Sequence, residues 1–202
     1  MEAAAAVFAE TGFRRATIRD ICRKAGANVA AVNYHFRDKG GLYRAVLEES
    51  YRRSLEKYPP NLGLTKNASP EERLEAFIYS FLLRIFSEGP EACHGKLLAM
   101  EMIEPTPTLD VLVENSFRPL AVQLSGIVGE ILGKSADPAQ VRLCGLSVVG
   151  QCVFYHHCKA VTSRLFPDMG FSAAELKNLS RHIAEFSLAG IRGSKKGKGK
   201  KA

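Results

Sequence analysis

TIRDICRKAGANVAAVNYHF, residues 17–36, predicts two short helices joined by a tight turn. Thr17 followed three residues later by Asp20 is a helix-start signal, because a hydroxyl caps free backbone N–H groups and an acid suits the positive end of a helix. Gly26 ends this helix in a left-handed conformation that glycine adopts at little cost. Asn28 is a suitable cap for a second helix.

The second of these helices has an apolar side and a polar side. Val32 and Phe36 are four residues apart and share one side, which leaves Ala30, Asn33 and Tyr34 on the other. A helix, a glycine-containing turn and a second helix form the helix-turn-helix motif, whose second helix lies in the major groove of DNA. An ordinary hairpin of two helices fits the same pattern, and the flanking sequence favours the DNA-binding motif.

Further helices are predicted on both sides of this motif. AAAAVFAETGF indicates a helix that ends at Gly12, and GLYRAVLEESYRRSLEKY indicates another downstream. PPNLGLTKNASP then predicts a surface connection, since it is rich in Pro, Gly and Asn. Helices follow to about Ile191, with a connection framed by Pro90 and Gly95 and one long helix from Pro138 to about Phe166. No segment shows strand alternation, so the predicted fold class is all-α.

Composition and charge agree with a DNA partner. A chain of 202 residues with 46% hydrophobic and 24% charged residues is typical of a soluble protein with a sizeable core. Residues 1–58 hold eleven Lys/Arg against seven Asp/Glu, and residues 59–192 hold twelve against fourteen. The tail, residues 193–202, holds five lysines and no acid. We predict that this tail is disordered and is either a solubilising end or an electrostatic hook for DNA.

Several classes of protein are disfavoured by what the sequence lacks. It has no apolar run of membrane-spanning length and no signal-peptide layout, and its five cysteines lack the spacing of a disulfide scaffold, so we expect a cytoplasmic protein. It has no recognisable catalytic or phosphate-binding motif, so we expect neither an enzyme nor a cofactor.

A cluster of cysteine and histidine residues raises the question of a metal site. Cys152 and His156 share a helix face, but a zinc site usually needs three or four convergent ligands. Core packing, the lining of a pocket or a dimer contact explains the cluster better, and we predict no metal. The cluster comprises Cys144, Cys152, His156, His157 and Cys158.

Four motifs, in order and at the right separation, resemble the DNA-binding domain of TetR-type transcriptional regulators: FAETGF, TIRDI…AG, AAVNYHF and DKGGLYRAVL. EMIEPTPTLD (101–110), FRP (117–119) and GQCVFYHHCKAV (150–161) are similar to the CecR-like subgroup. The resemblance implies a three-helix DNA-binding domain over residues 1–58 and a larger helical ligand-binding and dimerisation domain over residues 59–192. In the family a basic arm and another helical turn precede the position of Glu2, whereas Met1 here falls inside that helix. We expect either that the true start lies upstream of Met1 or that this protein lacks the arm contacts to phosphates.

The resemblance also implies which residues contact double-stranded operator DNA. The residues expected nearest the bases are Asn28, Val29, Ala30, Asn33 and Tyr34. Asparagine can pair with adenine through two hydrogen bonds, and valine and alanine can contact thymine methyl groups. The residues expected at phosphates are Thr17, His35 and Lys39. Tyr34 suits either role, and His35 alternatively packs beside Phe36.

The second domain is expected to bind a small-molecule effector of unknown identity. Polar or charged residues set into apolar segments either satisfy one another or orient a ligand in an apolar cavity. These residues are Glu101, Glu104, Arg118, Gln151, Tyr155 and His156. The family also implies a homodimer formed by the last two long helices, although small residues in these helices fit an intramolecular core equally well.

These expectations together predict a sequence-specific transcriptional regulator, namely a repressor that a ligand releases from its operator. The alternatives are a ligand-independent DNA-binding or architectural protein and a metal-dependent enzyme.

Overall fold

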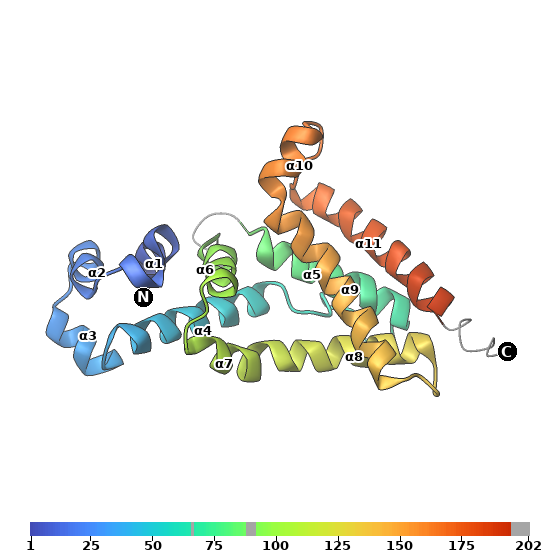
Figure 1. Ribbon diagram of the computed structural model, residues 1–202, viewed down its shortest axis with the longest axis horizontal. Coiled ribbons are helices and arrows are strands. Elements are labelled where there is room, and N and C mark those ends of the chain that lie inside the picture. The colour runs from blue at the N-terminus through green and yellow to red at the C-terminus, as the bar shows by residue number, and fades with distance from the viewer. Residues whose placement is uncertain (66, 88–91, 195–202) are drawn as a thin grey trace. The chain divides into compact units, whose positions relative to one another are not determined.

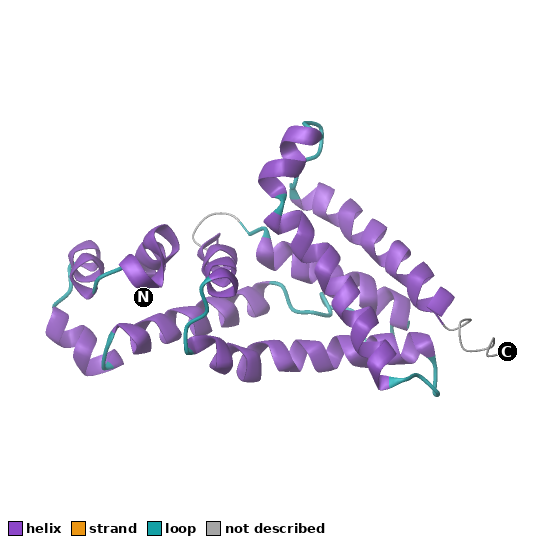
Figure 2. Cartoon of the chain, viewed as in Figure 1, coloured by secondary structure: helices purple, strands orange, loops and turns teal. Residues whose placement is uncertain are grey.

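The computed structural model describes residues 1–65, 67–87 and 92–194, and every regular element in these ranges is a helix (Figure 1; Figure 2). This confirms the predicted all-α class. Within the same ranges no helix combines the length and the apolar character that crossing a membrane requires. The predicted tail lies outside the described residues, except that Gly193 and Ser194 belong to the last helix.

The chain forms two compact units. The first unit comprises Met1–Lys57 and Ser87–Phe117, and the second comprises Tyr58–Phe86 and Arg118–Ala202. The domain limits that the sequence suggested, 1–58 and 59–192, stay a prediction. The first unit differs from the predicted first domain because residues 92–112 pack with the N-terminal helices.

The first unit packs around α1 and α4. Phe8 and Tyr43 are buried in its core and meet edge to face, with ring centroids 4.9 Å apart. Helix α1 is interrupted at Gly12, whose φ of 76° and ψ of 164° are not helical, where the sequence predicts that this helix ends. The elements of the unit are α1 (Glu2–Arg15), α2 (Ile18–Ala25), α3 (Val29–Phe36), α4 (Lys39–Lys57), α6 (Ala92–Ile103), α7 (Thr108–Leu112) and a π-helical turn, η2 (Val113–Phe117).

Local capping forms the helix-turn-helix as the sequence predicts. The Thr17 hydroxyl accepts a hydrogen bond from the Asp20 backbone N–H at 3.1 Å. Gly26 ends α2 in the left-handed region with φ of 61°, and Asn28 caps α3 by accepting from the Ala30 N–H at 2.9 Å. Val32 of α3 is buried inward, which confirms the predicted orientation of this helix.

The second unit contains four long helices, which Figure 1 labels α5, α8, α9 and α11. They pack around one apolar core. Ser69 and Glu72 cap the first of them reciprocally. Leu74, Ile78 and Ile183 are fully buried in the core. The elements are α5 (Pro70–Ile85), α8 (Arg118–Leu132), α9 (Pro138–His157), α10 (Lys159–Leu165) and α11 (Ala173–Ser194).

Two predicted boundaries are wrong. The helix expected from Pro138 to Phe166 is interrupted at Cys158, where α9 ends and α10 begins. No proline or glycine marks this break. The Lys159 ammonium lies 5.4 Å from the Phe171 ring centroid, a tertiary contact that periodicity does not reveal. Of the two residues expected to frame a connection, Gly95 lies inside α6 and Pro90 lies outside the described residues.

Candidate DNA-binding surface and effector residues

The solvent side of α3 presents the residues predicted to contact bases. Tyr34 is 85% exposed, and its ring meets that of His35 edge to face with centroids 5.2 Å apart. Polar and apolar groups therefore stand in solvent along one short helix, where a DNA groove can reach them. The exposed residues are Asn28, Val29, Ala30, Asn33, Tyr34 and His35.

Three polar side chains on this surface differ in how far the fold already uses them. The Asn28 amide oxygen caps α3, and the Thr17 hydroxyl donates to the Asp20 carboxylate at 2.5 Å. The Asn33 side chain makes no hydrogen bond within the residues that the structure describes. Asn33 is therefore best placed for the two-bond pairing with adenine, which needs both amide atoms.

Lys39, predicted to contact a phosphate, lies in a different setting. It is half-buried, and its ammonium donates to the carbonyl oxygens of Ala16 at 3.1 Å and Arg14 at 3.3 Å. The same nitrogen lies 4.6 Å from the centroid of the Phe13 ring. Two exposed arginines lie near α3 and could attract phosphates. Arg37 directly follows α3, and Arg23 on α2 pairs with Asp20.

A helix-turn-helix whose second helix exposes amide, aromatic and imidazole side chains is built to contact the major groove. The fold and this surface therefore define a DNA-binding protein of the helix-turn-helix class.

Glu101, predicted to contact an effector, is fully buried in the first unit. Its carboxylate accepts hydrogen bonds from the Tyr43 hydroxyl at 2.9 Å, the Thr106 backbone N–H at 2.8 Å and the Thr106 hydroxyl at 2.9 Å. Burial, helped by the neighbouring Glu101 carboxylate, raises the pKa of the Tyr43 hydroxyl. We name these three residues the Glu101 node. It ties α4 to the end of α6.

Glu104 lies three residues further on and is exposed. Its carboxylate is 3.4 Å from the Arg14 guanidinium. Both side chains line a pocket of about 460 Å³ between the end of α1 and the turn after α6. Apolar atoms of Phe13, Ile103 and Pro105 form part of its wall.

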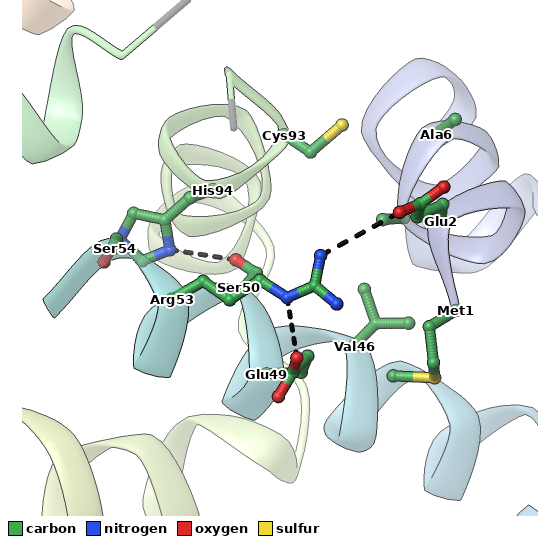
Figure 3. A pocket seen from close by; sticks show the side chains of 11 residues that line it. Met1, Glu2, Ala6, Val46, Glu49, Ser50, Arg53, Ser54, Cys93 and His94 are labelled. Carbon is green, nitrogen blue, oxygen red and sulfur yellow. Dashed lines mark hydrogen bonds and ion pairs between the residues drawn. The ribbon is translucent and has the colours of Figure 1, made fainter. Parts of the chain in front are cut away.

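A second pocket, of about 320 Å³, lies among α1, α4 and α6 (Figure 3). On its wall the His94 Nδ1 and the Ser50 hydroxyl are 3.0 Å apart. Arg53 spans Glu49 and Glu2, and hydrogen bonds from Arg52 and Arg53 lower the pKa of Glu49 to about 2. None of the predicted effector residues lines this pocket.

The other four predicted effector residues belong to the second unit. The Gln151 amide donates to the Ser187 hydroxyl at 3.0 Å. Tyr155 and His156 are half-buried, and the His156 ring meets Phe86 edge to face at 5.3 Å. Burial lowers the pKa of His156, with smaller contributions from His157 and Lys159. Arg118 is exposed. The structure therefore divides the six predicted effector residues between the two units. The second unit contains Gln151, Tyr155, His156 and Arg118, and the first contains Glu101 and Glu104.

The cysteines of α9 lie in an apolar setting. Cys152 is buried, and this burial raises the pKa of its thiol to about 12, so it stays protonated at neutral pH. Among the described residues, no group of three or more His, Cys, Asp or Glu side chains could hold a metal ion.

Sequence reasoning missed an apolar surface on α9 and α11. Leu146 of α9 is 61% exposed and Phe186 of α11 is 65% exposed. A helical projection of residues 138–157 could have found it, because the side opposite the buried Val148 and Cys152 is also apolar. The exposed members on α9 are Leu143, Leu146, Val153 and Phe154.

Comparison with known proteins identifies the class further. Residues 1–46 match the model for the bacterial regulatory proteins of the tetR family, and residues 70–191 match that for the C-terminal domain of the HTH-type transcriptional dual regulator CecR. The chain is 26% identical over 161 residues to CecR of Shigella flexneri, covering 76% of this chain and 72% of CecR.

Other matches are shorter or structural. The chain is 32% identical over 69 residues to the HTH-type transcriptional regulator BetI of Escherichia coli (strain K12 / DH10B), covering 34% of this chain and 35% of BetI. The crystal structure of the transcriptional regulator FadR from Bacillus subtilis, in complex with stearoyl-CoA, matches with a TM-score of 0.70 at 18% identity, covering 94% of this chain and 96% of FadR. That likeness shows the fold.

The chain belongs to the TetR family of bacterial transcriptional regulators and has a CecR-type C-terminal domain. It is therefore a DNA-binding transcriptional regulator and not an enzyme, as the sequence motifs predicted.

Proposed function

We propose that this protein is a cytoplasmic, homodimeric repressor that a small molecule releases from a palindromic operator near its own gene. The observation that carries the proposal is the helix-turn-helix with its exposed α3 face. Fluorescence anisotropy with DNA flanking the gene, against scrambled DNA over a salt series, tests it. We expect the operator to bind at least about 10³-fold more tightly than scrambled DNA. Equal, steeply salt-dependent binding to both would contradict specific recognition.

The exposed apolar side of α9 and α11 supports the homodimer. Gly150, Ala189 and Gly190 are exposed on these helices beside Leu146 and Phe186, and small residues permit close helix packing. Not every small residue serves this purpose, because Gly145 faces Leu124 and Ala184 is buried within the unit. Two copies related by a two-fold axis would then present two recognition helices to two half-sites.

Leu146→Asp should convert the dimer into a monomer, because it places a charge in the centre of the proposed apolar interface. Sedimentation velocity should then show half the mass of the wild-type protein. Val122→Asp is the matched control, since Val122 is 67% exposed on α8, outside the proposed interface. A Leu146→Asp protein that stays dimeric would rule out this face.

Asn33→Ala should reduce discrimination at one base pair of the operator by about 1–3 kcal/mol, because it removes a two-bond contact to a base. Competition anisotropy against operators altered one position at a time measures this. Asn178→Ala, at an exposed asparagine of α11, is the control. An equal loss on every sequence would instead assign Asn33 to the DNA backbone.

For the effector site we propose Gln151, Tyr155 and His156, with Arg118 as a further contact. Half-buried polar groups beside an apolar core suit the orientation of a small molecule. Glu101 and Glu104 stay in the proposal only as candidates, because Tyr43 and Thr106 hold the buried Glu101 carboxylate and Arg14 pairs with Glu104. Gln151 is retained because its bond to Ser187 uses the amide nitrogen and not the amide oxygen.

Release of the operator complex provides the screen for effectors. Stearoyl-CoA, the ligand in the FadR crystal structure, is a reasonable first probe. Thermodynamic reciprocity supplies a check, because DNA must weaken effector binding by the same factor by which the effector weakens DNA binding. A protein that no compound releases would favour ligand-independent DNA binding.

A further inference from the structure

Lys39 occupies a position that the helix it starts does not favour. It is the first residue of α4, whose first turn contains no acidic residue. Backbone N–H groups give a helix N-terminus a partial positive charge, so a cation there is locally unfavourable. The ammonium instead points to another element, the end of α1, and this suggests that its role lies in that contact.

The end of α1 offers what an ammonium requires. The last carbonyl groups of a helix have no partner within the helix and carry a partial negative charge. Lys39 donates to two carbonyl oxygens at this end, those of Arg14 at 3.3 Å and Ala16 at 3.1 Å, and its nitrogen lies 4.6 Å from the Phe13 ring centroid. An ammonium has three N–H donors. Two of them face carbonyls, so binding a phosphate would disturb an arrangement that the fold already makes.

The contact brackets the DNA-binding motif. The bond to Ala16 joins residues 23 apart, and the chain between them contains the whole of α2 and α3. Ala16 is itself buried and directly precedes Thr17, the cap of α2. Upstream, Gly12 interrupts α1, so intact α-helical geometry does not by itself fix the direction of the last turn.

We propose that Lys39 is a positioning residue for DNA recognition: its bonds to Arg14 and Ala16, supported by the Phe13 ring, form a clasp that holds the two ends of the helix-turn-helix together. The clasp acts on the free protein before DNA arrives. When it is lost, only a fraction of molecules has α3 correctly placed, and the apparent dissociation constant rises by the reciprocal of that fraction.

This role differs measurably from that of a phosphate ligand. A lysine that neutralises a phosphate contributes about 0.9 to the slope of log K against log salt concentration for each subunit. A positioning lysine lowers the competent fraction and leaves the bound complex, and so the slope, unchanged. The inference rests on the proposed operator recognition, and wild-type specificity for the operator is therefore established first, as a separate result.

Lys39→Met is the main variant, because methionine keeps the length and apolar stem without charge or donors. We expect operator affinity about 5- to 30-fold weaker, an unchanged salt slope and faster amide hydrogen exchange over residues 12–22 of the free protein. Arg44→Gln, which removes an exposed cation of the same helix that has no assigned DNA contact, controls for general loss of charge. Lys39→Arg retains charge and donors and should restore both affinity and exchange protection.

A second variant separates positioning from phosphate binding. Phe13→Leu leaves the charge of Lys39 in place but removes the ring beneath it, so the clasp predicts weaker operator binding with an unchanged slope. The double variant of Phe13→Leu and Lys39→Met should weaken operator binding by less than the product of the two single fold-changes, because both substitutions disrupt the same clasp. A salt slope that falls by about 0.9 per subunit in Lys39→Met, with exchange over residues 12–22 unaltered, would overturn the clasp and return Lys39 to the phosphate. Exchange is measured without DNA, so it tests the clasp even where no operator is bound.

Discussion

Gly41→Ala should abolish high-affinity operator binding and destabilise the first unit by about 2–4 kcal/mol. A Cβ atom on Gly41 would lie 2.0 Å from the Phe36 carbonyl oxygen and 3.1 Å from the Phe36 carbonyl carbon. Both are backbone atoms at the end of α3 and cannot turn aside as a side chain can. The turn between α3 and α4 must therefore shift, and α3 shifts with it.

Gly40→Ala is a closely matched control for this change. Its Cβ would meet only the Asp38 Oδ1 atom, at 3.2 Å, and a side-chain atom can move by the few tenths of an ångström required. Chemical denaturation followed by far-ultraviolet circular dichroism, together with operator anisotropy, compares the two variants. Equal stability and equal affinity for Gly40→Ala and Gly41→Ala would show that the turn relaxes freely.

The helix-turn-helix was predictable because its signals are local. A cap at Thr17, a left-handed glycine at Gly26 and a cap at Asn28 each depend on a few neighbouring residues, and the structure forms all three. Helical spacing alone also assigned Val32 inward and Tyr34 outward. The order of these signals along the chain then led to the family, which the comparisons confirm.

The parts that sequence reasoning could not supply depend on contacts between distant segments. Gly41 is needed because of a carbonyl group in the preceding turn, and Lys39 is engaged by backbone atoms more than 20 residues away. Every residue has a backbone carbonyl group, so a contact with one leaves no recognisable motif in the sequence. The break at Cys158 is of the same kind, since it carries no proline or glycine and accompanies a packing contact of Lys159.

The polar residues of the second half show a further limit. A polar side chain within an apolar helix is equally compatible with a ligand site and with an internal hydrogen-bond partner. The structure gives Gln151 a partner in Ser187 and gives Glu101 partners in Tyr43 and Thr106. Only the tertiary contacts distinguish a carboxylate that the fold already uses from one that is open to a ligand.

Glu101→Ala should lower the free energy of unfolding by about 3–5 kcal/mol. The carboxylate is fully buried and accepts from Tyr43 and twice from Thr106. Alanine leaves the Tyr43 hydroxyl and the Thr106 backbone N–H without this acceptor, and it leaves a cavity at the end of α6. Because α4 follows directly after the DNA-binding motif, we also expect weaker operator binding.

Glu104→Ala is the matched control, because the same residue type three positions later is exposed and pairs with Arg14 on the surface. Exposed ion pairs contribute little to stability, so the free energy of unfolding should change by no more than about 0.5 kcal/mol. Tyr43→Phe removes one of the hydrogen-bond donors to Glu101, so its loss of unfolding free energy should lie between those of Glu104→Ala and Glu101→Ala. A Glu101→Ala protein that is as stable as Glu104→Ala, but no longer responds to an effector that releases the wild type, would contradict the Glu101 node and make Glu101 an effector ligand. A large loss of stability in Glu101→Ala, with little loss in Glu104→Ala, instead means that the Glu101 carboxylate serves to join α4 to α6.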